Sequence, residues 1–414
     1  MHVLIAFDKF KDSLTAPHAC ELTAAALRER HPDWTLDLCP LADGGDGFCE
    51  ILTRAAGGTV ETHIVTGPRG TPTPASIGFV PLANIPSPAR TLLSLDMSHG
   101  SLDVPATVAV VEMATASGLA LLPPDQRDLW HTTTVGTGEL IRLAAARPGV
   151  TAILLGVGGS ATNDLGLGAL TALGLTFHSA DDTPVSPPIP AHWPRIAHLT
   201  GCLSLSRPQT PHPASIPSRP VSSGSSPNDP LPPIRIACDV NNPLLGPRGA
   251  AATFGPQKGL RPADLARLDH ECARLAHLLC AHTGRPGSLM DLPGAGAAGG
   301  ISFGLMAAAD AKLLPGFDLV SAWLDLERKL AAADLVITGE GSFDDTSLTG
   351  KGPGAVAARA LALGKPVHVF AGAVSLLKPR DHLTLHAITP AGTPLAQALR
   401  AAPELLTASV RQSL

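Results

Sequence analysis

The sequence predicts an α/β protein in which a doubly wound, Rossmann-like domain is built from both ends of the chain and a second α/β domain is inserted into it. Short apolar segments alternate with helical segments near both termini, which is typical of parallel sheets. The chain has 414 residues, more than one hydrophobic core usually holds. We expect the first domain at residues 1–70 and 290–414 and the inserted domain at residues 71–289.

The first strand, helix and strand can be identified at the N-terminus. Residues 3–7 are an apolar run that predicts a strand. Ser13 or Thr15 can cap a helix whose first turn suits Pro17, and we expect that helix over residues 17–30. Residues 35–39 predict the second strand. Ligands gather at the carboxyl ends of strands in doubly wound sheets, so the loops that follow these strands are candidate sites.

The central part of the chain has a different pattern. Residues 60–95 alternate apolar and polar positions in short pieces broken by glycine and proline, which predicts antiparallel strands. Residues 264–283 predict an amphipathic helix. Residues 179–233 are rich in proline and serine, and we expect a mobile surface insertion there. Further strands are expected at residues 108–113, 152–155, 234–240, 333–338, 365–371 and 385–388.

Composition excludes several classes of function. Lys and Arg number 30 against 35 Asp and Glu, aromatic residues are 3% of the chain, and no basic run occurs, which argues against a nucleic-acid partner. The seven cysteines form no CxxC pair, so neither a disulfide framework nor a zinc site is expected. We find no secretory signal and no membrane span in the sequence. We therefore expect a cytoplasmic protein without a membrane partner; its oligomeric state is left open.

The stretch at residues 151–168, TAILLGVGGSATNDLGLG, is the strongest candidate site. A buried strand breaks into glycines, reaches a polar set and continues into a helix. Glycines let a ligand approach main-chain N–H groups, which a helix N-terminus makes attractive to anions. The alternative is that the glycines only form a tight turn and that Ser160 and Asn163 cap the helix.

Glycine-rich loops with acidic residues recur at the ends of predicted strands. Each acid alone is more often a cap or turn residue, but loops that converge on one crevice indicate a site. Carboxylates can hold Mg²⁺ and accept a hydroxyl proton, while lysines and glycine N–H groups neutralise phosphate oxygens. The pattern indicates phosphoryl transfer. The acids are Asp43, Asp46, Asp164, Asp239, Glu340 and Asp344, and the lysines are Lys11, Lys258 and Lys351.

Other nucleotide-binding motifs were tested against the sequence. It contains no GxxxxGK[ST], HRD or DFG motif, which argues against a P-loop enzyme and a protein kinase. Gly294, Gly296 and Gly299 fit GxGxxG, with Asp318 near the ribose-binding offset. The segment before them is a poor strand, so close helix packing is the alternative explanation for these glycines.

These motifs, in order along the chain, resemble the bacterial glycerate kinase family. They are FDKFKDSLTA, LADGGDG, VEMATASGL, TTTVGTGELI, GVGGSATND, ACDVNNPLLG, FGPQKG, GAGAAGG and ITGEGSFD. The resemblance covers residues 3 to about 375. It implies two α/β domains, one inserted in the other, with a Mg²⁺-dependent ATP site and a small hydroxy-acid substrate in the cleft. The chain departs from the family pattern at Phe7, Lys9, Asp12, Leu165, Thr346 and Ser347.

On this resemblance we expect an ATP-dependent kinase that converts D-glycerate to phosphoglycerate. Asp164 or Asp43 would orient or deprotonate the attacking hydroxyl, and Lys11 and Lys351 would offset phosphate charge. Lys258 is the first candidate for the substrate carboxylate. The remaining assignments are Asp239, Glu340 and Asp344 for Mg²⁺, and Ser160, Asn163, Gly158 and Gly159 for substrate and phosphate.

Three alternatives stay open at this point. A kinase of a related hydroxy acid or sugar acid would differ only in substrate profile. A dinucleotide-dependent oxidoreductase would use GAGAAG, and a non-catalytic relative would only bind a metabolite. The sequence does not determine whether the product is 2- or 3-phosphoglycerate.

Overall fold

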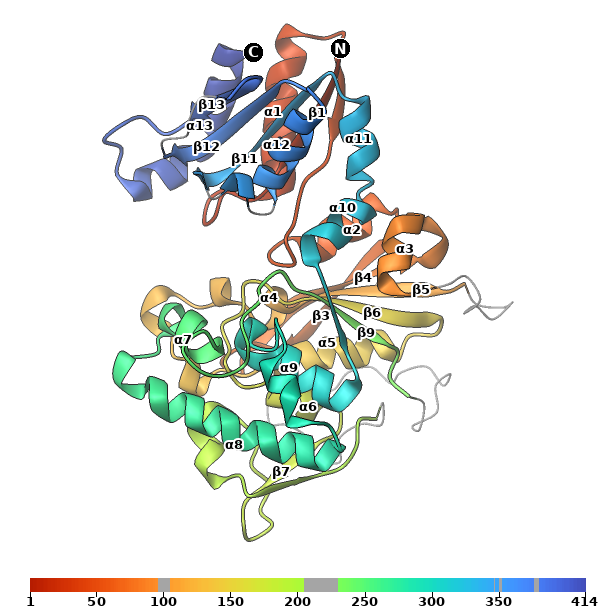
Figure 1. The fold of residues 1–414 in the computed structure, drawn as a ribbon, viewed down its shortest axis with the longest axis vertical. Helices are drawn as coiled ribbons and strands as arrows, with labels where there is room; N and C mark the ends of the chain where they lie inside the picture. The colour runs from red at the N-terminus through yellow and green to blue at the C-terminus, as the bar shows by residue number, and fades with distance from the viewer. Residues whose placement is uncertain (96–104, 205–229, 346, 350–351, 376–379) are drawn as a thin grey trace. The chain divides into compact units, whose positions relative to one another are not determined.

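The chain folds into two compact units, which are described separately here (Figure 1). The computed structural model describes residues 1–95, 105–204, 230–345, 347–349, 352–375 and 380–414. One unit consists of Met1–Asp43 and Phe317–Leu414, and the other consists of Gly44–Gly316. The predicted α/β class is confirmed, and the first unit combines both ends of the chain.

The boundaries between the two units differ from those expected from the sequence. Residues 44–70 and 290–316, which we expected in the first domain, belong to the second unit. The reason is pairing and packing: β3 (Thr59–Thr66) pairs antiparallel with β4 (Pro72–Pro81), and α9 (Ala297–Ala309) contributes to the second unit's core. The Gly- and Pro-rich segment between β3 and β4 is therefore a hairpin and not a domain boundary.

The first unit contains a parallel sheet whose described strands run in the order β13-β12-β11-β1-β2. Side chains of a strand alternate between its two faces, and Val3 and Ile5 of β1 face a core formed with helices α1 and α13. Helices α11 and α12 contact β1, and α12 also contacts β11 and β12. The elements are β1 (His2–Phe7), α1 (Ala16–Arg30), β2 (Thr35–Leu38), α11 (Leu326–Ala332), β11 (Leu335–Phe343), α12 (Pro353–Ala362), β12 (Val367–Val374), β13 (Leu383–Ala387) and α13 (Leu395–Ser413).

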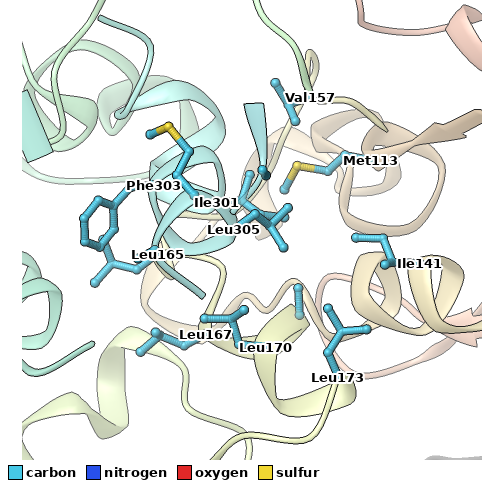
Figure 2. Close-up of a cluster of buried hydrophobic side chains, with 14 of the residues drawn as sticks. Met113, Ile141, Val157, Leu165, Leu167, Leu170, Leu173, Ile301, Phe303 and Leu305 are labelled. Carbon is cyan, nitrogen blue, oxygen red and sulfur yellow. The ribbon is translucent and has the colours of Figure 1, made fainter. Parts of the chain in front are cut away.

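The second unit contains a mixed sheet in the order β10-β9-β6-β5-β4-β3. Helix α5 packs with Ile141 against the core, and α2 contacts β4 and β5. Figure 2 shows Leu165, Leu167 and Leu170 in one cluster with Ile301. The other α-helices and strands of this unit are α2 (Phe48–Ala55), α3 (Ser87–Leu93), β5 (Thr107–Glu112), α4 (Met113–Ser117), α5 (Val135–Ala145), β6 (Val150–Gly156), α6 (Leu167–Ala172), β7 (Thr176–His178), β8 (His198–Thr200), β9 (Ile234–Ala237), α7 (Ala250–Phe254), α8 (Leu265–Thr283) and β10 (Lys312–Leu314). Helix α10 (Gly316–Trp323) begins at the last residue of this unit, and its other residues belong to the first unit.

The expectation of a mobile surface insertion at residues 179–233 is wrong for its first part. Residues 205–229 lie outside the described residues. Residues 179–204 fold: β7 pairs with β8, and Trp193 is fully buried, donating from Nε1 to the Pro188 carbonyl at 3.0 Å. Composition alone did not indicate that apolar residues without a regular period are buried here; they are Val185, Ile189, Trp193, Ile196 and Leu199.

Among the described residues, the two longest helices are α8 and α13, with 19 residues each. Helix α8 buries Leu268, Cys272 and Leu275, as its predicted amphipathic pattern requires. In the part of the chain that the structure describes, no helix combines the length and the apolar character needed to cross a bilayer.

Candidate active site

Acidic residues gather where the strand order of the first unit reverses. From β1 the chain passes through α1 to β2 on one side, and from β11 it passes through α12 to β12 on the other. Ligands bind beyond the carboxyl ends of the strands at such a switch point. Asp8 follows β1, Asp43 follows β2, and Glu340 lies in the carboxyl-terminal half of β11. The topology therefore brings these three acids to one end of the sheet.

The titration of Glu340 is strongly perturbed by its surroundings. Burial, together with the negative charges of Asp8, Asp344 and Asp43, raises the pKa of Glu340 to about 7, while a hydrogen bond from the Ser347 side chain acts in the opposite direction. The carboxylates thus repel one another, and a bound cation would relieve that repulsion. Perturbed carboxyl groups of this kind are typical of functional sites.

Contacts of two residues, Lys9 and Ser347, shape the acidic group. Lys9 donates its main-chain N–H to Asp8 Oδ1 at 2.7 Å, and its Nζ lies 4.0 Å from Asp43 Oδ1. Ser347 donates its main-chain N–H to Asp344 Oδ1 at 3.0 Å, and Ser347 Oγ accepts the main-chain N–H of Asp344 at 3.1 Å. Lys9 and Ser347 are two of the departures from the family pattern, and both contact the acids directly.

The carboxylates of the first unit are the candidate ligands for the expected Mg²⁺. Within the described residues, no three or more His, Cys, Asp or Glu side chains form a group arranged to hold a metal ion. Mg²⁺ in nucleotide sites commonly takes one or two carboxylates and completes its shell with water and phosphate oxygens. Glu340 and Asp344, beside Asp8, fit that pattern in charge and ligand type. Such a site would form fully only with the nucleotide present.

Asp239 was expected to join Glu340 and Asp344, but it belongs to the other unit. Asp239 follows β9, and its Oδ1 accepts a hydrogen bond at 3.0 Å from the main-chain N of Gly316, the first residue of α10. The role of Asp239 as a Mg²⁺ ligand therefore stays a prediction.

The side chain of Asp164 is enclosed and accepts hydrogen bonds at both of its oxygens. It is fully buried. Its Oδ2 accepts hydrogen bonds from the main-chain N and Oγ1 of Thr134, both at 2.8 Å, and from Gly168 N at 3.3 Å, while Oδ1 accepts Gly166 N at 3.2 Å. Burial raises the pKa of Asp164, and these hydrogen bonds act against that shift. With both oxygens occupied, this side chain is poorly placed to take a proton from a substrate, which argues against its expected role as base.

The glycines of the Ser160 loop bring two loops together. Gly158 donates its main-chain N–H to the Gly44 carbonyl at 2.9 Å, and a Cβ on Gly158 would lie 2.6 Å from the Cα of Gly45. Gly159 has φ of +72°, and a Cβ there would lie 2.9 Å from Asp46 Oδ1. Only glycine permits this approach, so these residues place Asp46 beside the Ser160 loop.

A buried lysine supports the same loop. Lys258 is 2% exposed, and its Nζ donates to Ser160 Oγ and to the Thr162 carbonyl, both at 2.7 Å. Burial lowers the pKa of Lys258 to about 7. The negative charge of Asp164 acts in the opposite direction, because it favours the ammonium form. Ser160 itself is 7% exposed. The Lys258 amine therefore reaches a ligand only through Ser160.

The remaining expected residues are scattered. Asn163 is fully buried, and its Nδ2 lies 3.9 Å from Cys272 Sγ of α8, so the side chain faces that helix. Lys11 is exposed in the first unit, with its main chain opposite Gly341 of β11. Lys351 lies outside the described residues.

Sequence reasoning missed Glu112 and did not assign Asp8 to the site. Glu112, 4% exposed at the end of β5, accepts the main-chain N–H of Gly47 at 3.2 Å and of Cys49 at 3.1 Å. These bonds hold the start of α2, directly after Asp46. The sequence feature that could have identified Glu112 is its position as an acidic residue at the end of a buried apolar strand.

The glycines of GAGAAGG serve packing. A 3-10 turn at Gly287–Asp291 precedes them, where a dinucleotide fingerprint requires a strand. A Cβ on Gly296 would lie 2.2 Å from the Pro243 carbonyl oxygen, and one on Gly299 would lie 2.1 Å from that of Thr162. Gly299 thus lets α9 approach the Ser160 loop. This is the close helix packing that the sequence offered as the alternative to a dinucleotide-binding role.

Comparison with known proteins gives one consistent family. The chain matches the Glycerate kinase family over residues 3–207 and 224–414. It is 35% identical to Glycerate kinase of Bacillus subtilis, over 99% of this chain and 96% of that protein, and 37% identical to Glycerate 2-kinase of Escherichia coli, over 91% of this chain and 86% of that protein. A crystal structure from Salmonella typhimurium LT2, named as a glycerate kinase 2, is similar with a TM-score of 0.68 and 35% identity, covering 100% of this chain and 96% of that one.

Proposed function

Because this chain belongs to the glycerate kinase family, we propose that it transfers the γ-phosphoryl group of ATP to a hydroxyl group of D-glycerate. The observation that carries the proposal is the acidic group at the switch point of the first unit, where Glu340 is half-buried and feels the charges of Asp8, Asp43 and Asp344. Phosphoryl transfer depends on positioning and charge neutralisation more than on covalent chemistry, and a repelling set of carboxylates is suited to holding a cation near phosphates.

The acidic group divides into two roles. Glu340 and Asp344 would hold Mg²⁺, with Asp8 beside them. When bound, that ion neutralises charge on the nucleotide phosphates. Asp43 is the better of the two expected candidates for the base: its side chain is 48% exposed, so it can meet a substrate, whereas Asp164 is enclosed. Asp43 would accept the proton of the attacking hydroxyl as the phosphoryl group is transferred.

The Ser160 loop of the second unit would bind an anionic oxygen of a ligand. Ser160 is backed by Lys258 and lies next to Gly159, which packs against Asp46. A hydroxyl group supported by a buried amine is suited to an anionic oxygen of a ligand. Asp164 and Glu112 keep this region in place through main-chain N–H groups and do not contact the ligand in this proposal.

Substrate profiling tests the proposal. ADP formation from Mg²⁺-ATP is followed with D-glycerate, L-glycerate, lactate and glycerol, which change one feature of the acceptor at a time. We expect the highest kcat/KM for D-glycerate and no turnover of glycerol, which lacks the carboxylate. A higher kcat/KM with another hydroxy acid would replace D-glycerate as the substrate. Reduction of NAD or NADP by D-glycerate, without ADP formation, would favour the oxidoreductase alternative.

A further inference from the structure

The pair formed by Lys258 and Ser160 has a defined hydrogen-bond direction when the lysine is charged. An ammonium group has three donors and no acceptor. Lys258 Nζ lies 2.7 Å from the Thr162 carbonyl oxygen, which can only accept, and 2.7 Å from Ser160 Oγ. Ser160 Oγ therefore accepts from the ammonium group, and its own hydroxyl proton must be donated in another direction.

We propose that Lys258 is a positioning residue whose ammonium form fixes Ser160 as a hydrogen-bond donor to an anionic oxygen of the ligand. This inference rests on the proposed function, which supplies two such anions, the carboxylate of the hydroxy acid and the phosphates of the nucleotide. Because Lys258 is 2% exposed and Ser160 is 7% exposed, the positive charge acts through the serine hydroxyl and not by direct contact.

The surrounding charges make this arrangement responsive to a ligand. Asp164 favours the ammonium form of Lys258 from the same loop. Asp46 lies against Gly159 and adds negative charge near Ser160. Burial raises the pKa of Cys272, so its thiol stays neutral. Arg127 approaches the lysine segment through its main chain, because its carbonyl oxygen would lie 2.2 Å from a Cβ on Gly259.

Binding of an anion at Ser160 is therefore coupled to protonation of Lys258. Burial lowers the pKa of Lys258 to about 7, so most of the free protein carries a neutral amine at pH 8. A bound anion favours the ammonium form and raises that pKa. Binding should take up a proton from the buffer, approaching about 0.9 proton per site at pH 8 and only about 0.1 at pH 6.

Titration calorimetry at pH 8, in two buffers of different ionisation enthalpy, measures this uptake. One arm titrates D-glycerate alone, and the other titrates a non-hydrolysable ATP analogue with Mg²⁺. We expect the uptake in the arm whose anion meets Ser160, and its loss in Lys258→Met and Ser160→Ala. Lys312→Met, at an exposed lysine of the same unit, is the matched control and should keep it. Uptake unchanged in Lys258→Met would overturn the inference.

Kinetics separates this role from base catalysis. KM for the coupled ligand should rise about tenfold per pH unit above pH 7, with kcat unchanged, and Ser160→Ala should make KM independent of pH in this range. If kcat rises through pH 7 instead and Lys258→Met abolishes that rise, Lys258 acts as a neutral base and the inference is wrong. Circular dichroism checks that Lys258→Met folds; if it does not, Ser160→Ala and Ser160→Thr decide, since only the threonine keeps the hydroxyl and should keep the uptake.

The outcomes also separate the inference from the proposed function. Wild-type turnover of D-glycerate with proton uptake that is insensitive to Lys258→Met and Ser160→Ala would remove the inference and leave the function intact. Absence of both turnover and ligand binding in the wild-type protein would remove both.

Discussion

Asp164 and Thr134 are joined by two hydrogen bonds, in which the main-chain N and Oγ1 of Thr134 each donate to Asp164 Oδ2 at 2.8 Å. Thr134 precedes α5, and Gly166, another donor to Asp164, precedes α6. Free N–H groups at helix N-termini are stabilised by a carboxylate. Asp164 thus links the N-termini of α5 and α6, next to the loop that contains Ser160.

The first prediction concerns Asp164→Asn. The new amide NH₂ would face N–H and O–H donors, so we expect the variant to lose about 1.5–3 kcal/mol in its free energy of unfolding. Urea unfolding measures the loss. Asp291→Asn, at an exposed position, should change stability by less than about 0.5 kcal/mol. Unchanged stability with kcat reduced a thousandfold would restore Asp164 as a catalytic residue.

The second prediction concerns Asp43→Asn. This substitution removes the proposed base and keeps the size of the side chain, so we expect kcat to fall by about 10²- to 10⁴-fold. Because Asp43 is substantially exposed, the melting temperature should change little. Asp33→Asn, in the same unit and exposed, should keep full activity. Wild-type kcat in Asp43→Asn would exclude the role.

Local sequence signals predicted the elements well, because each depends on neighbouring residues. β1 follows its apolar run, and α1 begins after Thr15, whose side chain accepts the main-chain N–H of His18 at 3.3 Å. Helix α13 was not expected, although its buried Ala398, Ala402, Leu406 and Val410 recur every four residues.

The site was predicted less completely, because its contacts join distant parts of the chain. Asp164 meets Thr134 thirty positions away, and no local pattern shows that its carboxylate is saturated. Lys258 stands between glutamine and glycine in a polar motif, yet it is buried by packing against the Ser160 loop. The acids at the switch point could be placed at strand ends from the sequence, but their mutual repulsion depends on the strand order.

The third prediction follows from Glu340. Its pKa is raised to about 7 in the folded protein, mainly by burial, whereas an unfolded glutamate titrates near 4.5. The folded protein therefore binds more protons between these values, and stability should fall as pH rises from about 4.5 to 7. Glu340→Gln should reduce this fall, measured as melting temperature against pH with EDTA and no nucleotide.

Glu404→Gln provides the control for Glu340. It changes an exposed glutamate of the same unit and should keep the wild-type slope of melting temperature against pH. Identical slopes in Glu340→Gln and the wild-type protein would show that Glu340 is not held in the predicted environment.

The fourth prediction concerns Glu112. Glu112→Ala removes the acceptor for the N–H groups of Gly47 and Cys49 at the start of α2, so we expect a loss of about 0.5–2 kcal/mol in urea unfolding. Glu50→Ala changes an exposed glutamate in the same helix and should cost less. Equal stability of the two variants would contradict the capping role.

The central claim is the transfer of a phosphoryl group from ATP to D-glycerate. Phosphorus NMR of the wild-type protein with Mg²⁺-ATP and D-glycerate measures this directly, because the γ-phosphate signal is replaced by that of a phosphate monoester. We expect one equivalent of phosphoglycerate for each ADP, and proton coupling identifies the 2- or the 3-isomer. An unchanged ATP spectrum, or release of inorganic phosphate alone, would contradict the account.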